Sequence, residues 1–426
     1  MLRKTALLLL IHFGAPTLAL AIERANYSAS LDLQSAQHTS KPQDSASQKA
    51  VFQFEQFVGF NKRWSGVFGV HGFYEGQYKN HPDDYPKPLR DQDTQDFRLH
   101  DTFLEYRTRD WSTKIGNQQV VWGESFGTSY LDLVNPKDLR EGQSLNFSKI
   151  RLPNFMLNVK YSSRKDSLQM ILIPRPLYNI MALPGSDFSS LLQETTAFKD
   201  TQITREKEGK PGNLEYGLRY SQNFKKVDLS YIFFSYFDRY PNYRPGAATA
   251  PPDLLVLDEH HARITSYGLA FAADLDGYLV RGEGIFTNGR RFHTKDGETF
   301  GLQTTDETAY TVSVDLPTWS SLNVSLQIAE SRFLTAAPYF QRQQLQQFGG
   351  ARLLWSFENG SNLQMVWTPS LTDKGSRLQG EYMYPLGSRF ELQMGAESYE
   401  GASESDFGRL RRASRVYLLL KSFFRG

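Results

Sequence analysis

The sequence predicts an all-β protein, a single antiparallel transmembrane β-barrel. Polar and apolar residues alternate one for one along much of the chain, as in residues 322–328 and 389–397. Because successive side chains of a strand point to opposite faces, each such strand has one apolar and one polar face. Many strands of about ten residues with this pattern, separated by turn residues, are typical of barrels whose apolar side faces lipid. Aromatic residues make up 14% of the chain, and such barrels use them in girdles at both membrane interfaces.

The N-terminus has the pattern of an export leader. Arg3 and Lys4 precede a mainly apolar stretch that runs to Leu20, and Ala19 and Ala21 form an A-x-A cleavage site. A transmembrane helix is the alternative, but the uninterrupted apolar run is short for a bilayer. We therefore predict a signal peptide at residues 1–21 and one barrel domain at 22–426.

Composition limits the classes of function. The chain has no cysteine, which excludes a disulfide framework, a thiol nucleophile and a thiolate metal site. It has 48 basic and 46 acidic residues, and two of the basic ones lie in the predicted leader, so the mature chain is close to neutral. This charge balance provides no basic surface for nucleic acid. Any ion selectivity must therefore come from local groups.

The turns predict the size of the barrel. Short and long connections alternate, as expected for periplasmic turns and extracellular loops. The short ones lie near residues 61–63, 109–110, 163–165, 225–226, 275–277, 317–319, 358–360 and 385–387. The longer ones lie near 79–95, 123–153, 174–212, 239–259, 289–306, 332–344, 371–374 and 400–411. With an upward first strand at 27–34, both termini lie in the periplasm and the wall has about 18 strands, with 16 as the alternative.

The C-terminal strand supports the same location. Val416, Leu418, Leu420 and Phe424 lie on one face, and an apolar last strand ending in an aromatic residue resembles the assembly signal of outer-membrane proteins. Arg425 and one glycine follow the phenylalanine, which departs slightly from that pattern. Together with the leader, this strand predicts the outer membrane of a Gram-negative cell.

Residues 123–153 interrupt the alternation. This stretch combines acidic and basic residues with apolar ones such as Leu131, Leu133 and Leu139, and Pro153 closes it. A solvated loop does not need so many apolar residues, whereas a loop that folds inward and packs against the wall does. An extracellular loop with local packing is the other interpretation, and residue chemistry leaves both open.

The same stretch resembles a known family. The order W-G-E, D, N-P-x-D-x-R and R-x-P is similar to an uncharacterised family of proteobacterial outer-membrane proteins, known only as a domain of unknown function. The matching residues are Trp122, Gly123, Glu124, Asp132, Asn135, Pro136, Asp138, Arg140, Arg151 and Pro153. A glycine-led hairpin at 277–283 adds a second, weaker match. The resemblance implies a porin-like outer-membrane barrel and, more loosely, association with RND-type exporters of hydrophobic compounds. It names no substrate.

Arg281 and Glu283 in that hairpin share one strand face, and Tyr278, Val280 and Phe286 occupy the other, which should meet lipid. The charged pair should therefore point into the lumen. It is either a solvated wall pair or an anchor, through charge-assisted bonds, for the loop that carries Asp138 and Arg140. The predicted constriction and lumen residues are Trp122, Glu124, Asp132, Asp138, Arg140, Arg151, Arg281 and Glu283. Further lumen charges expected to set selectivity are Glu215, Arg219, Arg389 and Glu391.

The sequence favours a passive channel for solutes or export cargo. The alternatives are a non-conducting scaffold or docking partner of a lipid or hydrophobic-compound exporter, and, third, a barrel-embedded hydrolase. Catalytic motifs are absent, and the adjacent His260 and His261 point to opposite faces, so they form a poor chelate for one metal. We predict no catalytic residue, cofactor or metal. The expected partners are outer-membrane lipid and lipopolysaccharide, a small-molecule or lipid-like substrate and an RND-type or periplasmic export system, but no nucleic acid.

Overall fold

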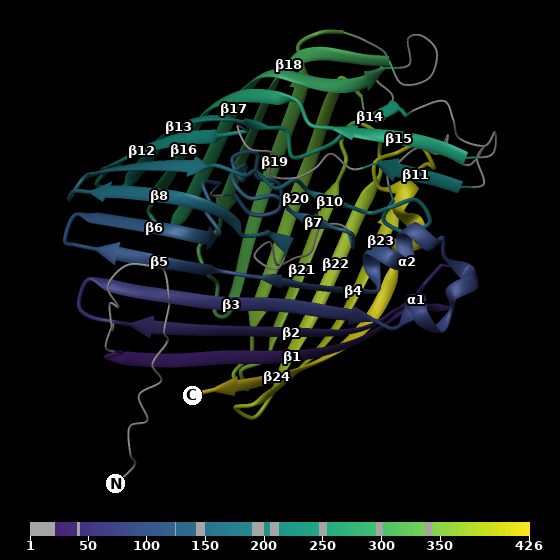
Figure 1. Cartoon of the computed structure of the whole chain (residues 1–426), viewed down its shortest axis with the longest axis horizontal. Helices are drawn as coiled ribbons and strands as arrows, with labels where there is room; N and C mark the ends of the chain where they lie inside the picture. The colour runs from purple at the N-terminus through teal and green to yellow at the C-terminus, as the bar shows by residue number, and fades with distance from the viewer. Residues whose placement is uncertain are drawn as a thin grey trace, which may run out of the picture.

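The computed structural model describes residues 22–40, 43–123, 125–141, 150–189, 200–204, 213–246, 254–294, 301–336 and 343–426. The predicted signal peptide at 1–21 and Glu124 lie outside this part of the chain. One antiparallel sheet closes on itself to form the wall (Figure 1). Its strands are β1 (Arg24–His38), β2 (Ser45–Gly59), β3 (Trp64–Glu75), β4 (Gln95–Leu99), β5 (Thr102–Arg107), β6 (Trp111–Gln118), β8 (Asn154–Ser162), β9 (Asp166–Ile173), β12 (Glu215–Phe224), β13 (Val227–Phe237), β16 (Arg263–Leu275), β17 (Tyr278–Thr294), β18 (Gly301–Asp315), β19 (Leu322–Phe333), β20 (Leu345–Ser356), β21 (Asn362–Pro369), β22 (Ser376–Leu386), β23 (Phe390–Glu400) and β24 (Arg415–Arg425).

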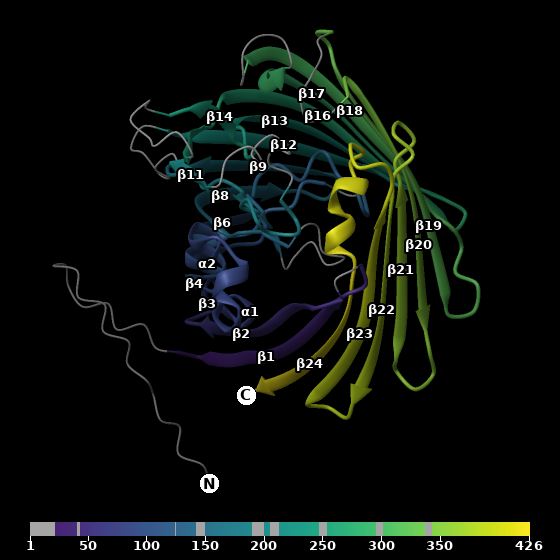
Figure 2. The ribbon, with the colours of Figure 1, turned by 90° about the vertical axis from the view of Figure 1, so that its right-hand side faces the viewer.

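The described residues form 18 wall strands, which confirms the predicted number and not the alternative of 16. The two short strands β4 and β5 both pair with β3 and are separated by His100 and Asp101, so they form one wall strand. The first strand, β1, pairs with both β2 and β24 and thereby closes the barrel. Figure 2 shows this seam, where β1 lies beside β24.

The smaller elements lie mostly at the end of the barrel away from the C-terminus, with β7 and β10 further along its length (Figure 1). They are α1 (Gln77–Asn80), η1 (Pro82–Asp84), α2 (Lys87–Asp93), β7 (Asp138–Leu139), β10 (Ile180–Met181), β11 (Asp200–Thr204), β14 (Asn242–Pro245), β15 (Leu254–His260) and η3 (Gly408–Ala413). All of them belong to connections predicted to be long. By the usual asymmetry of such barrels, this end is extracellular.

The eight short connections lie where the sequence predicts them. Turn chemistry explains one of them well, since Asp276 and Gly277 adopt φ values of 55° and 97° between β16 and β17. The predicted long loop at 289–306 is mostly strand instead, because β17 runs to Thr294 and β18 begins at Gly301. A register shift next to Gly289, with φ of 82°, lets the hairpin continue beyond the point where the alternation breaks.

The wall separates an apolar exterior from a polar interior. On β19, Leu326 and Ile328 are 44% and 46% exposed on the outside, whereas Ser325 and Ser331 are buried on the inside. Aromatic side chains pair on the outside near the short turns, as do Trp64 and Tyr106, whose ring centroids are 4.9 Å apart. The outside of the wall is thus suited to lipid and to its interface. Among the described residues, no helix is long and apolar enough to cross a membrane.

Candidate functional site

The connection between β6 and β8, residues 119–153, is called the lumen segment below. Three of its side chains, Trp122, Leu131 and Val134, are fully buried in a cluster with the inward faces of β8, β9, β13 and β16. The wall makes room for them with glycines: a Cβ at Gly217 would lie 2.7 Å from Trp122, and one at Gly268 would lie 2.4 Å from Leu131. The inward interpretation is therefore confirmed, because the apolar residues of this segment are buried inside the barrel.

Glu283 holds the first half of the lumen segment to the wall. Its carboxylate accepts hydrogen bonds from the backbone N–H groups of Ser125 and Leu131 at 2.7 and 3.1 Å, and from the Ser129 hydroxyl at 2.9 Å. The Glu283 side chain comes from β17 and is almost completely buried, at 3% exposure. Charge-assisted bonds of this kind are stronger than neutral ones, so this carboxylate is a principal clamp on the segment.

Neighbouring strands add to this attachment. The Gln327 amide on β19 accepts from the Thr128 N–H and donates to the Thr128 carbonyl, both at 3.0 Å. On β20, the Arg352 guanidinium lies 4.9 Å from the centre of the Phe126 ring, within range of a cation–π contact. The lumen segment is thus fixed to three wall strands, β17, β19 and β20, and to β18 through Thr311.

The later part of the lumen segment reaches a different part of the wall. Glu141 forms ion pairs with Lys49 on β2 and with Arg415 on β24, the latter at 3.3 Å. These two strands flank β1, and three wall strands, β21–β23, separate β24 from β20. The described parts of the segment therefore contact one part of the wall through residues 125–131 and another through Glu141.

Arg140 and Asp138 form the centre of a charged network in the segment. The Arg140 guanidinium donates to Asp138 at 2.5 Å and to Asp96 of β4 at 2.9 Å, and Arg98 of β4 donates to Asp138 at 2.9 Å. Burial alone would raise the pKa of the Asp138 carboxyl, but the hydrogen bond and charge of Arg140 hold that pKa well below its usual range. Asp138 is therefore ionised at neutral pH.

The other predicted residues have partners that differ from the expectation. Asp132 pairs within the lumen segment, with Arg151 at 3.0 Å and Lys137 at 3.2 Å. Arg281 pairs with Asp315 on β18 at 2.6 Å. The expected bonds from the hairpin on β17 to Asp138 and Arg140 are not those seen, since Glu283 binds residues 125–131.

Three of the expected selectivity charges also have bonding partners. Glu215 is fully buried and forms a bidentate pair with Arg239, at 2.9 and 2.7 Å, so it is not a charge in open lumen water as predicted. Arg219 donates to the Ser230 hydroxyl at 3.1 Å. Glu391 accepts from Gln393 of the same strand at 2.5 Å, and Arg389 lies in an exposed short turn.

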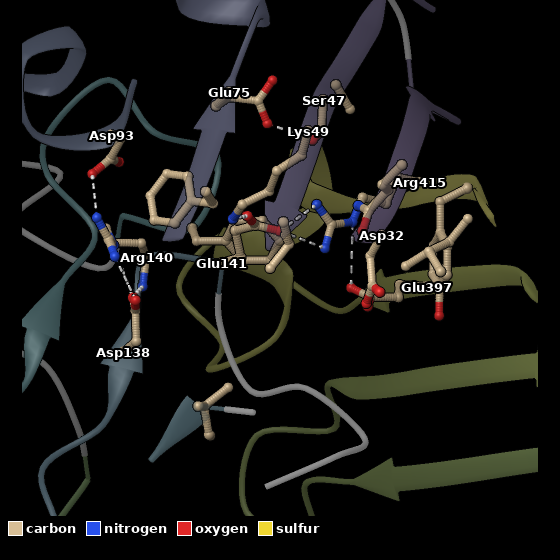
Figure 3. Close-up of a pocket in the computed structure, with 18 of the residues that line it drawn as sticks. Asp32, Ser47, Lys49, Glu75, Asp93, Asp138, Arg140, Glu141, Glu397 and Arg415 are labelled. Atoms are coloured by element: carbon tan, nitrogen blue, oxygen red, sulfur yellow. Dashed lines mark hydrogen bonds and ion pairs between the residues drawn. The ribbon is translucent and has the colours of Figure 1, made fainter. Parts of the chain in front are cut away.

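Between the lumen segment and the wall formed by β22–β24 and β1–β3 lies a cavity of about 220 Å³. Its ionisable lining is rich in carboxylates, and most of these residues were not singled out from the sequence. The acidic members are Asp32, Glu75, Asp93, Asp138, Glu141, Glu381 and Glu397, and the basic ones besides His71 are Lys49, Arg140 and Arg415. Figure 3 shows Arg140 between Asp93 and Asp138, and Glu141 beside Lys49 and Arg415.

Asp93, at the end of α2, gives the site a pH dependence. Burial raises the pKa of its carboxyl from 3.8 to about 6, with Arg140 and Lys49 opposing the shift and Asp138 adding to it. Because the folded protein binds this proton more tightly than the unfolded chain does, the stabilising contribution is complete below pH 3.8. It is lost as pH rises through about 6.

We expect the free energy of unfolding to fall by on the order of 2–3 kcal/mol from this group across that window. In Asp93→Asn, which stays neutral, this part of the pH dependence should vanish. Urea titrations at pH 4 and pH 7 measure the free energy of unfolding of the parent and of the variant. If this free energy changes equally with pH in the two proteins, Asp93 does not titrate in this range.

The closed 18-strand wall, its apolar exterior and its lumen segment give this outer-membrane barrel the fold of a porin. The chain belongs to the family described as "Protein of unknown function (DUF1302)", whose model matches residues 43–375. This confirms the family resemblance found in the sequence. No curated protein matches the chain in sequence.

Solved structures resemble this one in fold. Acinetobacter baumannii OccAB1 has a TM-score of 0.57 at 10% identity, over 95% of this chain and 97% of that one. Pseudomonas aeruginosa OccK8 (OprE) has a TM-score of 0.55 at 8% identity, over 95% and 98%. The outer membrane protein OpdK from Pseudomonas aeruginosa has a TM-score of 0.53 at 9% identity, over 95% and 100%. At these identities the likeness concerns the fold alone.

Proposed function

We propose that the protein is a passive channel for small polar solutes in the outer membrane, with the lumen segment as its constriction. The observation that carries the proposal is the cavity between that segment and the wall of β22–β24 and β1–β3, which is lined mainly by polar and charged side chains. A barrel of 18 strands is too wide for its wall side chains to fill, so its interior holds water wherever no loop occupies it. The resemblance in fold to OpdK and OccK8 is consistent with this role.

The arrangement of charges suits passage rather than storage of a ligand. Glu141, Arg140 and Asp138 project from the segment toward the cavity, and Lys49 and Arg415 meet them from the wall. A solute that passes the constriction replaces part of its hydration shell by contacts with these side chains. Charged rings or patches of this kind set selectivity in membrane pores.

The purified barrel in a planar lipid bilayer should produce stepwise currents in KCl. Conductance should be small for a barrel of this width, since the lumen segment occupies part of the cross-section. Replacing residues 125–141 by a short glycine-serine linker should enlarge each step, provided that the variant retains a β-rich circular dichroism spectrum. A folded parent and a folded linker variant that both fail to conduct would refute the channel.

A further inference from the structure

The wall that faces the lumen segment carries a group of hydrogen-bond acceptors around one aromatic ring. We call this group the acceptor patch and define it as Glu381 on β22, Gln393 and Glu397 on β23, and Tyr417 on β24. All four side chains line the cavity. Gln393 and Glu397 lie on the same face of β23, and Gly395 stands between them on that face.

Tyr417 lies over Gly395. The two residues are direct cross-strand partners, and a Cβ built on Gly395 would come within 2.1 Å of the tyrosine ring. The ring can therefore lie along the wall and cross β23, so that its hydroxyl donates to Glu381 on β22 at 2.7 Å. The ring thus covers the glycine, and Tyr417 lines the cavity.

The side-chain carbonyl oxygen of Gln393 accepts no hydrogen bond from the described residues. Its amide nitrogen donates to Glu391 at 2.5 Å, whereas its Oε1 atom is buried and has no hydrogen-bond partner among the described residues. The whole residue is 5% exposed. A buried carbonyl oxygen that accepts no hydrogen bond is costly, so this atom favours a ligand that supplies an N–H or O–H donor.

The charges in the cavity favour a cationic donor. Seven carboxylates and three Lys or Arg side chains line it. The cations Lys49 and Arg140 are engaged by Glu141 and Asp138 on the segment side of the cavity. Arg415 bonds to Glu141 and forms a longer ion pair with Glu397, at 3.8 Å, so this one cation is shared by two carboxylates, and Glu381 forms no ion pair among the described residues. The acceptor patch thus keeps an excess of negative charge.

We propose that the acceptor patch binds the ammonium or guanidinium group of an organic cation that enters the lumen. Such a group supplies several N–H donors for Glu397, Gln393 and Glu381, and its charge is attracted to an aromatic ring such as that of Tyr417. The inference rests on the proposed channel, since it names the class of solute that the channel prefers. Confinement between the segment and the wall increases the effect of the carboxylates, as in cation-selective pores.

The test measures equilibrium binding to the purified full-length barrel by ligand-observed NMR. The probes are agmatine, which carries a guanidinium and an ammonium group, and glutarate, a dianion of similar length. Agmatine should bind saturably, and glutarate should bind at least about tenfold more weakly. Glu397→Gln and Glu381→Gln should each weaken agmatine binding about tenfold, since each removes a charged acceptor.

Glu358→Gln is the matched control. It removes the same charge from an exposed short turn outside the cavity, and it should bind agmatine as the parent does. Circular dichroism checks that each variant is folded. Preference for glutarate, or unchanged agmatine binding in both cavity variants, would overturn the inference.

Bilayer currents test the proposed function separately. A barrel that binds agmatine at the patch but never conducts would refute the channel and leave the binding site. A barrel that conducts but does not bind agmatine would refute the site and leave the channel.

Discussion

Glu283→Gln should release the first half of the lumen segment from the wall. The substitution removes the charge that accepts from Ser125, Ser129 and Leu131, and it leaves these donors with a single neutral oxygen. Bonds to a charged acceptor contribute roughly 1.5–3 kcal/mol each, so the local cost is at least about 2 kcal/mol. We expect larger and noisier single-channel currents, together with faster proteolysis within the segment.

Arg281→Gln is the matched control for this experiment. It neutralises a charge on the same face of the same strand, two residues away, but Arg281 pairs with Asp315 of the wall. Asp315 also lies 3.8 Å from Arg352, which remains in the variant. Proteolysis of the segment should therefore match the parent. If the two variants behave alike, Glu283 is not the clamp and the apolar cluster alone holds the segment.

Arg239→Gln should destabilise the whole barrel more than any other single change considered above. The Arg239 guanidinium pairs with Glu215 and donates to the carbonyls of Leu177 and Val134, at 3.0 and 2.9 Å. It thereby joins the lumen segment, the connection after β9 and the wall at one buried point. Its loss leaves the Glu215 carboxylate, which is fully buried, without a counter-ion. Breaking a buried pair in this way costs about 3–5 kcal/mol.

Urea unfolding of the barrel in lipid vesicles measures this cost. The double variant Glu215→Gln, Arg239→Gln should recover part of the stability, because it removes the unpaired charge. Arg263→Gln is the control, since Arg263 is exposed, donates to Leu214 and Ser235, and forms no ion pair within the described part of the chain. If the Arg239 and Arg263 variants unfold at the same urea concentration, Arg239 does not stabilise the barrel in the way described.

The wall of this barrel could be predicted because lipid imposes a strict requirement on alternate residues. Leu326 and Ile328 have to be apolar, and the period of two fixes both the strand and the side that faces inward. The same parity correctly placed Glu283 in the lumen. Burial of the lumen segment could be anticipated for a related reason, since apolar side chains such as Leu131 are costly to leave in water.

The partners inside the lumen could not be predicted in the same way. A polar interior accepts almost any polar side chain, so no period marks the residues that meet there. Glu283 binds Ser125, 158 residues away, and Arg281 on the same face binds a different strand. Glu141 follows Arg140 in the chain, and the adjacent sequence contains no pattern that predicts its bonds to Lys49 and Arg415. Those pairings depend on the path of the segment across the barrel.

The position of Glu141 also has a consequence for the closure of the barrel. Lys49 and Arg415 lie on the two neighbours of β1, where the first and last strands of the wall meet. Arg415 follows Glu141 by 274 residues and belongs to the final strand. Its bond to Glu141 requires β24 and the lumen segment to be in place together, whereas Glu283 joins the segment to β17 alone. Because Glu141 bonds to both neighbours of β1, completion of the constriction and closure of the seam depend on each other.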